Sequence, residues 1–306
     1  MSWVSFSGVR VPLRTTTPVR PRFSLTSDIV SFRRCSRQYG FLGNDGFAPA
    51  QTLQVFYGMI IHQVLDRCHR HYSGLLNSGS QGTVPSDHDI EMYFGEVENA
   101  LRSQGIRPVS SNIRNRALQI IQTFNRLEGP HLYPRVVDTE FRLESDRSQY
   151  IMRGVVDVIA ENQNIAAGGR EIWDYKGSDR PNASDPILRD YVFQMSVYAE
   201  LYRARTGSSP NKAILYFLNE LKTSPGVSEP DRRPPRAIYE VDFSNPAIIQ
   251  DALNAFDQTA EEIINCKQRQ NWPEPDRNKK PNEETCNICD LRWSCSHGPS
   301  RPRLPL

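Results

Sequence analysis

The sequence contains no long apolar stretch. No hydrophobic run approaches the roughly 20 residues of a membrane-spanning helix, and the N-terminus lacks the continuous apolar segment of a signal peptide. The net charge is also small, because 37 Lys and Arg residues against 35 Asp and Glu residues give +2. These absences argue against a membrane protein, a secreted protein and a uniformly basic protein. We therefore expect a cytoplasmic protein in which any nucleic-acid contact depends on local basic patches.

Two further patterns are missing. The chain has no Gly-x4-Gly-Lys-Ser/Thr loop, so it cannot couple ATP hydrolysis to the unwinding of nucleic acid through such a loop. It also shows no internal repeat and no low-complexity tract. At 306 residues and 35 kDa it has room for one large domain or two small ones, and a hydrophobic content of 38% allows a packed core.

The order of helical and extended patterns predicts a mixed α/β domain. Residues 1–23 are rich in Arg and Pro and suggest an irregular arm, and residues 24–306 suggest a single domain. Within it, residues 73–130 suggest a helical insertion and residues 271–306 a Pro-rich tail. Apolar spacing predicts helices over 27–39, 55–71, 190–205 and 246–268, with two more in 88–129, and strands over 136–143, 150–160, 171–176, 213–218 and 237–243.

Two carboxylates and a lysine lie on neighbouring predicted strands. Asp157 ends the run Gly154-Val155-Val156-Asp157, and Asp174 precedes Lys176 by two residues, so the latter two share a strand face. Pairing the strands would bring the carboxylates together, and paired hard oxygen donors suit Mg²⁺ or Mn²⁺. A lysine beside such a site could orient water or neutralise charge on a phosphate. The alternative is that Asp-x-Lys is an exposed strand edge.

Three other elements carry polar residues that such a site could use. His62 lies on a mostly apolar helix, as a buried histidine or as a further metal ligand. Glu140 lies on the strand before Asp157 and could assist the site or balance Arg142. Gln194 and Tyr198 are four residues apart on one helix, so they share a face and could hold a nucleotide or phosphate. The alternative for this last pair is an ordinary surface pair.

The six cysteines favour metal binding over disulfides, because we expect the chain to be cytoplasmic. Cys286-x2-Cys289-x5-Cys295 supplies three thiolates, and Cys35 is the best-placed fourth. Four thiolates suit Zn²⁺ or an iron–sulfur cluster. One distant cysteine with a closely spaced triad favours a [4Fe–4S] cluster, which would join the two ends of the chain. Cys68 and Cys266 are interpreted as ordinary helix cysteines.

The ordered set of motifs resembles the PD-(D/E)XK nucleases of the RecB/AddB type, which include CRISPR-associated adaptation nucleases with an iron–sulfur cluster. The resemblance spans roughly residues 24–295 and is carried in order by Ser24 to Cys35, Gly58/His62, Gly154/Asp157, Asp174/Lys176, Gln194/Tyr198 and Cys286/Cys289/Cys295. Ser36 departs from the pattern, because the family usually has proline after the first cysteine.

The resemblance implies a central mixed sheet flanked by helices. It implies that His62, Asp157, Asp174 and the backbone carbonyl of Tyr175 bind Mg²⁺ or Mn²⁺, and that Lys176 is catalytic. Gln194 and Tyr198 would complete the active site. The four cysteines of the motif would ligate the [4Fe–4S] cluster.

We therefore expect a metal-dependent DNA nuclease, an exonuclease acting on single strands or DNA ends, in DNA repair, CRISPR adaptation or phage defence. The alternatives are a nuclease subunit that needs a separate helicase partner and a non-catalytic DNA-binding subunit. Candidate phosphate contacts are six arginines in two groups, Arg33, Arg34 and Arg37 near the first cysteine and Arg232, Arg233 and Arg236 in a Pro-rich loop. Each could instead be a solvated surface charge.

Overall fold

The computed structural model describes residues 3–6, 9–12, 20–44, 53–162, 168–222 and 230–274, with the single positions 281, 285, 286, 289 and 295. Its main element is a six-stranded mixed sheet in the order β3-β5-β6-β7-β8, with β4 paired to β5 off this path. The strands are β3 (Arg22–Ser24), β4 (Val136–Asp146), β5 (Ile151–Glu161), β6 (Arg170–Lys176), β7 (Lys212–Phe217) and β8 (Ile238–Asp242). Among the helices so described, none is long and apolar enough to cross a membrane.

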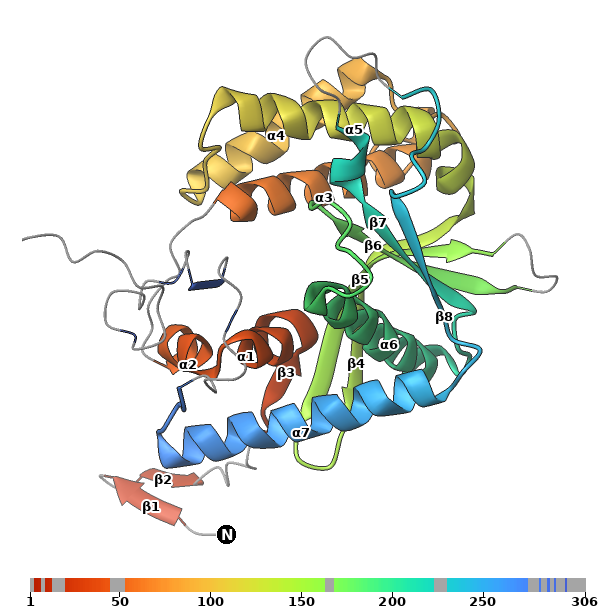
Figure 1. Ribbon diagram of the computed structural model, residues 1–306. Coiled ribbons are helices and arrows are strands. Elements are labelled where there is room, and N and C mark those ends of the chain that lie inside the picture. The colour runs from red at the N-terminus through yellow and green to blue at the C-terminus, as the bar shows by residue number, and fades with distance from the viewer. Residues whose placement is uncertain are drawn as a thin grey trace, which may run out of the picture.

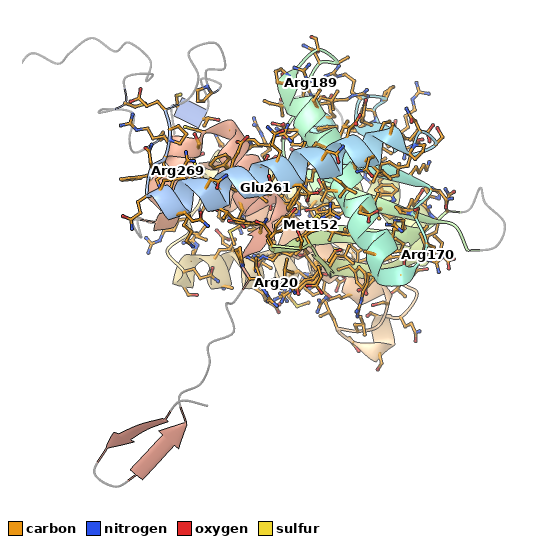
Figure 2. All side chains as sticks on the ribbon, turned by 90° about the horizontal axis from the view of Figure 1, so that it is seen from below. Arg20, Met152, Arg170, Arg189, Glu261 and Arg269 are labelled. Atoms are coloured by element: carbon orange, nitrogen blue, oxygen red, sulfur yellow. The ribbon has the colours of Figure 1, made fainter. Side chains whose placement is uncertain are left out.

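Helices cover both faces of the sheet (Figure 1). On one side lie α3 (Leu53–Tyr72), α4 (Asp87–Ser103) and α5 (Ser111–Leu132). On the other lie α6 (Pro186–Thr206) and α7 (Ala247–Arg269), together with a π-helical turn (Leu25–Val30), α1 (Ser31–Arg34) and α2 (Ser36–Asn44). Short 3₁₀ turns cover Ser78–Ser80, Tyr133–Arg135 and Leu218–Leu221. Figure 2 shows α7 lying across the lower face, with Glu261 along it and Arg269 at its C-terminal end.

Each side of the sheet has its own hydrophobic core. We call them the α6–α7 core, which contains Leu143, Met152 and Val156, and the α3–α5 core, which contains Val158 and Ala160. Strands β6 and β7 are buried almost throughout, as expected for central strands covered on both faces. They are parallel, and α6 makes the crossover between them.

Along the paired strands β4 and β5, the core toward which a given set of alternate side chains points changes from one side of the sheet to the other. Met152, Val156 and Val158 are all even positions of one strand and should share a face, yet the first two pack in the α6–α7 core and the third in the α3–α5 core. The change of side therefore occurs at Asp157. The opposite residue on β4 is Glu140, whose backbone is left-handed with φ of 49°. The ladder omits this pair, between Thr139↔Val158 and Phe141↔Val156.

The sheet also divides at this point. One edge of β5 pairs with β3 through Arg153 and with β6 from Val158 onward, so among the strands that the structure describes none pairs there with residues 154–157. Strand β6 continues past its pairing with β5 and carries Asp174 to Lys176 alongside β7 alone. The carboxylate of Asp157 fills part of this gap by accepting a hydrogen bond from the backbone amide of Tyr175 at 2.7 Å.

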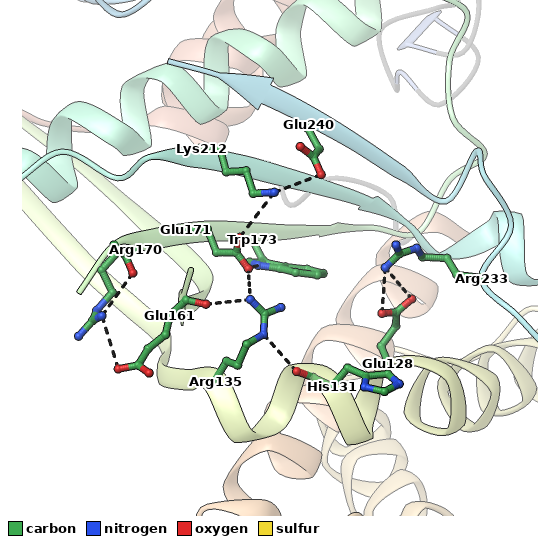
Figure 3. Close-up of polar contacts among 11 residues, drawn as sticks. Glu128, His131, Arg135, Glu161, Arg170, Glu171, Trp173, Lys212, Arg233 and Glu240 are labelled. Atoms are coloured by element: carbon green, nitrogen blue, oxygen red, sulfur yellow. Dashed lines mark hydrogen bonds and ion pairs between the residues drawn. The ribbon is translucent and has the colours of Figure 1, made fainter. Parts of the chain in front are cut away.

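A buried ion-pair network fixes the other end of β6 (Figure 3). Glu171 is 3% exposed and accepts a hydrogen bond from Arg135 at 2.6 Å. Arg135 also donates to the backbone carbonyl of Glu161 on β5, at 2.8 Å. Lys212 on β7 lies 3.9 Å from Glu171 and 3.2 Å from Glu240 on β8. Because the charges are partnered, this end of the sheet is a structural anchor for the strands that carry the polar site.

The expectation of an irregular arm over residues 1–23 is only partly right. Residues Trp3–Phe6 (β1) and Val9–Pro12 (β2) pair as antiparallel strands, and β3 joins the main sheet beside β5. The helix expected over 27–39 begins earlier, where the Ser24 hydroxyl accepts a bond from the amide of Ser27, and it is interrupted by extended backbone at Cys35. The helical insertion expected over 73–130 corresponds to α4 and α5, which pack on α3.

Candidate active site

The gap in the sheet opens into a cleft of about 1150 Å³. It lies between α3 on one side and α6 with the segment following β6 on the other. Its lining contains all the residues that the sequence motifs predicted for the metal site and for catalysis, namely His62, Asp157, Asp174, Tyr175, Lys176, Gln194 and Tyr198. Residues more than 100 positions apart in the chain therefore meet in one cavity.

One wall of the cleft brings an imidazole and two carboxylates together. Single ligand atoms of His62, Glu140 and Asp157 all lie within 4.8 Å of one another. Nδ1 of His62 is 3.3 Å from Oδ2 of Asp157. Sequence reasoning left Glu140 undecided between this site and a role beside Arg142. The structure places its carboxylate with the other two groups, because Glu140 stands opposite Asp157 across the β4–β5 pair and opposite residues of an antiparallel pair share a face.

The opposite wall holds a second polar group. Nζ of Lys176 lies 2.6 Å from Oδ2 of Asp174 and donates to Oε1 of Gln194 at 2.7 Å. The amide nitrogen of Gln194 donates to Oδ1 of Asp174 at 2.9 Å and lies 3.0 Å from the hydroxyl of Tyr198. Gln194 thus holds the Asp174–Lys176 pair on both sides. We expected Gln194 and Tyr198 to hold a nucleotide or phosphate, but their polar atoms here face this pair and each other.

Burial and neighbouring charges both shift the pKa values of the acidic and imidazole groups in the cleft. Burial lowers the pKa of His62, but the Asp157 carboxylate more than reverses this and raises it to about 9. Burial raises the pKa of Asp157, yet His62, the Tyr175 amide and Lys176 together bring it below its usual value. Burial and the neighbouring Asp157 charge raise the pKa of Asp174 in spite of Lys176. The two aspartates therefore occupy unequal environments, which is typical of functional sites.

The donor set fits a divalent cation. It combines imidazole nitrogen with carboxylate oxygens, the ligand types that Mn²⁺ and Mg²⁺ accept in proteins. Oδ2 of Asp174 is buried, and its contact in the described structure is the ion pair with the ammonium of Lys176 at 2.6 Å. A carboxylate oxygen can accept more than one contact, so a bound cation could be held by this oxygen beside Lys176.

A glycine allows α6 to approach the sheet at this site. An ideal Cβ on Gly154 would lie 2.6 Å from Cε1 of Tyr198 and 3.1 Å from Cδ1 of Leu201. Distances this short exclude a side chain, so β5 and α6 pack closely where the glycine stands. This close contact brings Gln194 and Tyr198 within reach of β6. At Gly58, in the other predicted glycine motif, none of the described residues outside the local helix backbone comes within 4 Å of an ideal Cβ.

The six candidate phosphate-binding arginines divide into two groups. Arg34 and Arg236 line the cleft. The other four lie elsewhere in the structure. Arg33 stacks over the ring of Phe193, Arg37 pairs with Glu274, Arg233 pairs with Glu128 (Figure 3), and Arg232 is exposed. Sequence reasoning missed Arg180, which lines the cleft and is joined to Arg236 through Glu220. Its position directly after the Asp-x-Lys strand was the available signal.

The N-terminal and C-terminal cysteines occupy one neighbourhood. Burial raises the pKa of the Cys35 thiol, and charge on Cys289 and Cys295 raises it further. The pKa of Cys286 is likewise raised by burial and then by Cys35, Cys289 and Cys295. All four side chains are partly buried. Cys68, by contrast, is fully buried in the α3–α5 core and Cys266 lies on α7.

The segment before the cysteine triad docks on the N-terminal helices. Trp272 packs against Phe32 and Tyr39, and its ring covers Gly40 so closely that a Cβ there would lie 2.0 Å from it. The hydroxyl of Ser36 donates to the carbonyl of Pro273 at 2.9 Å. These contacts join the two ends of the domain independently of any metal.

Two solved structures match this chain over most of its length. A "putative exonuclease" from Eubacterium rectale matches with a TM-score of 0.50 and 16% identity over 93% of this chain and 90% of that chain. At that identity the match shows a shared fold. A structure of a protein named SSO0001 matches at 16% identity over 88% of this chain and 96% of that chain, with a TM-score of 0.29, which supports no argument.

Comparison with curated proteins finds no match. The family model of the PD-(D/E)XK nuclease superfamily, however, matches residues 23–296. That span contains the divided sheet, both walls of the cleft and the cysteines at either end of the domain. The chain therefore belongs to the PD-(D/E)XK nuclease superfamily.

Proposed function

We propose that this nuclease hydrolyses phosphodiester bonds of DNA in a reaction that depends on Mg²⁺ or Mn²⁺, and that it acts on single strands or DNA ends. The observation that carries the proposal is the meeting of three carboxylates, an imidazole and a lysine in one cleft, with the basic residues Arg34, Arg180 and Arg236 along its lining. Phosphate contacts by arginine position a nucleic acid without reading its sequence.

His62, Glu140, Asp157, Asp174 and the backbone carbonyl of Tyr175 would hold the cation. When bound, it would polarise the scissile phosphate and lower the pKa of a water molecule. The protein's own contribution is to place Lys176. Its ammonium, fixed between Asp174 and Gln194, can orient the attacking water and neutralise charge that develops on the phosphate. Its side chain is 14% exposed, so little solvent screens this charge.

We also propose that Cys35, Cys286, Cys289 and Cys295 ligate a [4Fe–4S] cluster. The mutual effects on the pKa values of Cys35 and Cys286 support the proximity of the four thiols. A cluster there would add a covalent link to the docking of Trp272 on the N-terminal helices. Thr285, adjacent to Cys286, lines the cleft. The cluster would therefore lie near the path of a bound strand.

The decisive experiment compares cleavage of 5′- and 3′-labelled single strands with added Mg²⁺ or Mn²⁺. Asp174→Asn keeps the shape of the side chain and removes its charge, and we expect cleavage to fall by at least about 100-fold. Lys176→Met should slow turnover at saturating metal, and its metal affinity should stay closer to that of wild type than the affinity of Asp174→Asn does. Asp146→Asn is the matched control, because that carboxylate is exposed at the far end of β4.

Unchanged metal-dependent cleavage by Asp174→Asn would overturn the site assignment. A wild-type chain that binds Mn²⁺ and DNA, but cuts only after a helicase has supplied single strands, would identify a subunit of a larger enzyme. A chain that binds DNA and cuts under neither condition would be a non-catalytic subunit.

A further inference from the structure

Two histidines of α3 contact the same aromatic ring. His62 and His69 are seven residues apart, about two helical turns, so they lie on one face of the helix. The ring of Tyr175 lies edge-on to His62, with 6.2 Å between centroids, and parallel to His69, with 6.2 Å between centroids and 10° between planes. The hydroxyl of Tyr175 also lies 2.9 Å from Nε2 of His69. Tyr175 of β6 is therefore joined to α3 through both histidines.

The backbone of Tyr175 is part of the candidate metal site. Its amide donates to Oδ2 of Asp157 at 2.7 Å, and its carbonyl is a proposed ligand. It stands between Asp174 and Lys176, the two groups of the opposite wall. Because β6 no longer pairs with β5 at this position, the β5–β6 ladder does not fix the peptide on that side. A constraint on the Tyr175 ring is consequently a constraint on the peptide that joins both walls.

His69 is well suited to supply this constraint. It is 3% exposed, and Tyr175 is equally buried. Nδ1 of His69 has no hydrogen-bond partner, so the bond to Tyr175 is the one that the imidazole makes in the described structure. The ring of Tyr133 packs against the other side of the imidazole, at 4.8 Å between centroids. The imidazole thus has a fixed position and a single hydrogen-bonded contact, which leads to the site.

We propose that His69 is a positioning residue, which holds the Tyr175 peptide in the geometry that Asp157 and a bound cation require. This inference rests on the proposed metal-dependent function and adds to it a residue outside the cleft lining. Groups that orient metal ligands from outside the ligand set can be worth about 10-fold in metal affinity when they are removed. We expect His69 to act through Tyr175, without touching DNA or metal.

The same helix provides a matched control. His71 is also buried, 8% exposed, and its Nδ1 lies 2.7 Å from the hydroxyl of Tyr93 on α4. This second histidine–tyrosine pair lies two residues away and belongs to the packing of α3 against α4, away from the cleft lining. Nε2 of His71 also lies 3.4 Å from the hydroxyl of Thr83, so a purely structural effect of losing the imidazole should be at least as large at His71 as at His69.

The experiment compares His69→Gln and Tyr175→Phe with His71→Gln and Tyr93→Phe. Mn²⁺ affinity is measured by calorimetry, amide hydrogen exchange over residues 170–177 by mass spectrometry without metal, and kcat and KM on single-stranded DNA. We expect the first pair of variants to bind Mn²⁺ about 10-fold more weakly, with faster exchange at 174–176 and lower kcat at unchanged KM. The double variant His69→Gln/Tyr175→Phe should be no worse than either single.

The outcomes separate the two proposals. If wild type binds Mn²⁺ and cuts DNA, and His69→Gln matches His71→Gln in metal affinity, exchange and kcat, the positioning role is wrong and the proposed function stands. If wild type neither binds Mn²⁺ nor cuts DNA, the proposed function fails and this inference fails with it. Additive losses in the double variant would show that His69 does not act through Tyr175.

Discussion

Glu140 stands opposite Asp157 in the β4–β5 ladder, and its backbone is left-handed with φ of 49°. A non-glycine residue in this conformation costs about 1–2 kcal/mol. The strain lies at the point where the even-numbered side chains of β5 change from packing in the α6–α7 core to packing in the α3–α5 core. The same residue carries a carboxylate that lies beside His62 and Asp157 at the point where the sheet opens. Strain and candidate site thus share one residue.

Substituting this residue should separate stability from metal binding. Glu140→Gly removes the strain and should stabilise the chain by about 1 kcal/mol in urea unfolding, because glycine adopts positive φ without steric cost. Glu140→Gln keeps the strain and removes only a carboxylate whose pKa burial and the Asp157 charge raise to about 6, so at neutral pH it should stabilise the chain less than the glycine variant does. Both variants should weaken Mn²⁺ binding, measured by calorimetry. Glu144→Gln, on the same strand beside Arg22, is the control. Normal Mn²⁺ affinity in both Glu140 variants would exclude this residue from the ligand set.

Two glycines of the sequence motifs should respond oppositely to alanine. Gly154→Ala places a methyl group 2.6 Å from the Tyr198 ring and should destabilise the chain by about 1–3 kcal/mol. Cleavage should also slow, because Tyr198 contacts Gln194. Gly58→Ala meets open space within α3 and should stabilise the chain by about 0.5–1 kcal/mol. Urea unfolding measures both effects. A Gly154→Ala variant as stable as wild type would show that α6 can move away from the sheet at little cost.

Much of this site could be predicted from the sequence, because regular alternation fixes which residues share a strand face. Asp174 and Lys176 illustrate this: they are two positions apart and both line the cleft. Glu140 could not be assigned in the same way. Nothing in its identity signals positive φ, which glycine or asparagine would have suggested. The reversal of strand faces at Asp157 is imposed by the two cores, which are visible only after folding.

The arginines show a second limit of sequence reasoning. Arg33 and Arg34 are neighbours with the same charge, yet one stacks on Phe193 and the other lines the cleft. Periodicity does not predict such partners, since Phe193 comes from a distant helix. The interruption at Cys35 was missed for a related reason. A single extended residue does not disturb the apolar spacing of the helices on either side.

Loss of any proposed cluster ligand should have the same effect. Anaerobically purified wild type should contain about four irons per chain, and Cys35→Ser and Cys289→Ser should both lose iron and unfold at lower temperature. The double variant should be little worse, because four ligands of one cluster act as a unit. Cys266→Ser, on α7, should keep its iron. Full iron content in Cys35→Ser would refute the shared cluster, and stoichiometric zinc without iron or sulfide would show that the metal was wrongly chosen.

The buried His69 should make the metal-free protein sensitive to acid. Burial lowers the pKa of this imidazole from 6.5 to about 3. Above pH 6.5 the side chain is neutral in both folded and unfolded chains, so it contributes no pH dependence. Below pH 6.5 the unfolded chain binds a proton that the folded chain excludes. The free energy of unfolding should therefore fall by about 1.4 kcal/mol for each pH unit until the folded pKa is reached.

Urea unfolding in EDTA at pH 7, 6 and 5 can isolate this contribution. His69→Gln should be less stable than wild type at pH 7, because it loses the packed imidazole and the bond to Tyr175. The glutamine side chain does not titrate, so this variant does not lose stability through position 69 as the pH falls. The difference in unfolding free energy between wild type and His69→Gln should therefore narrow by roughly 1 kcal/mol between pH 6 and pH 5. Carboxylates that titrate in this range affect both proteins alike and cancel in the comparison. A difference that stays constant from pH 7 to pH 5 would mean that the folded protein accepts a proton on His69, and that the imidazole is less isolated from solvent than its burial indicates.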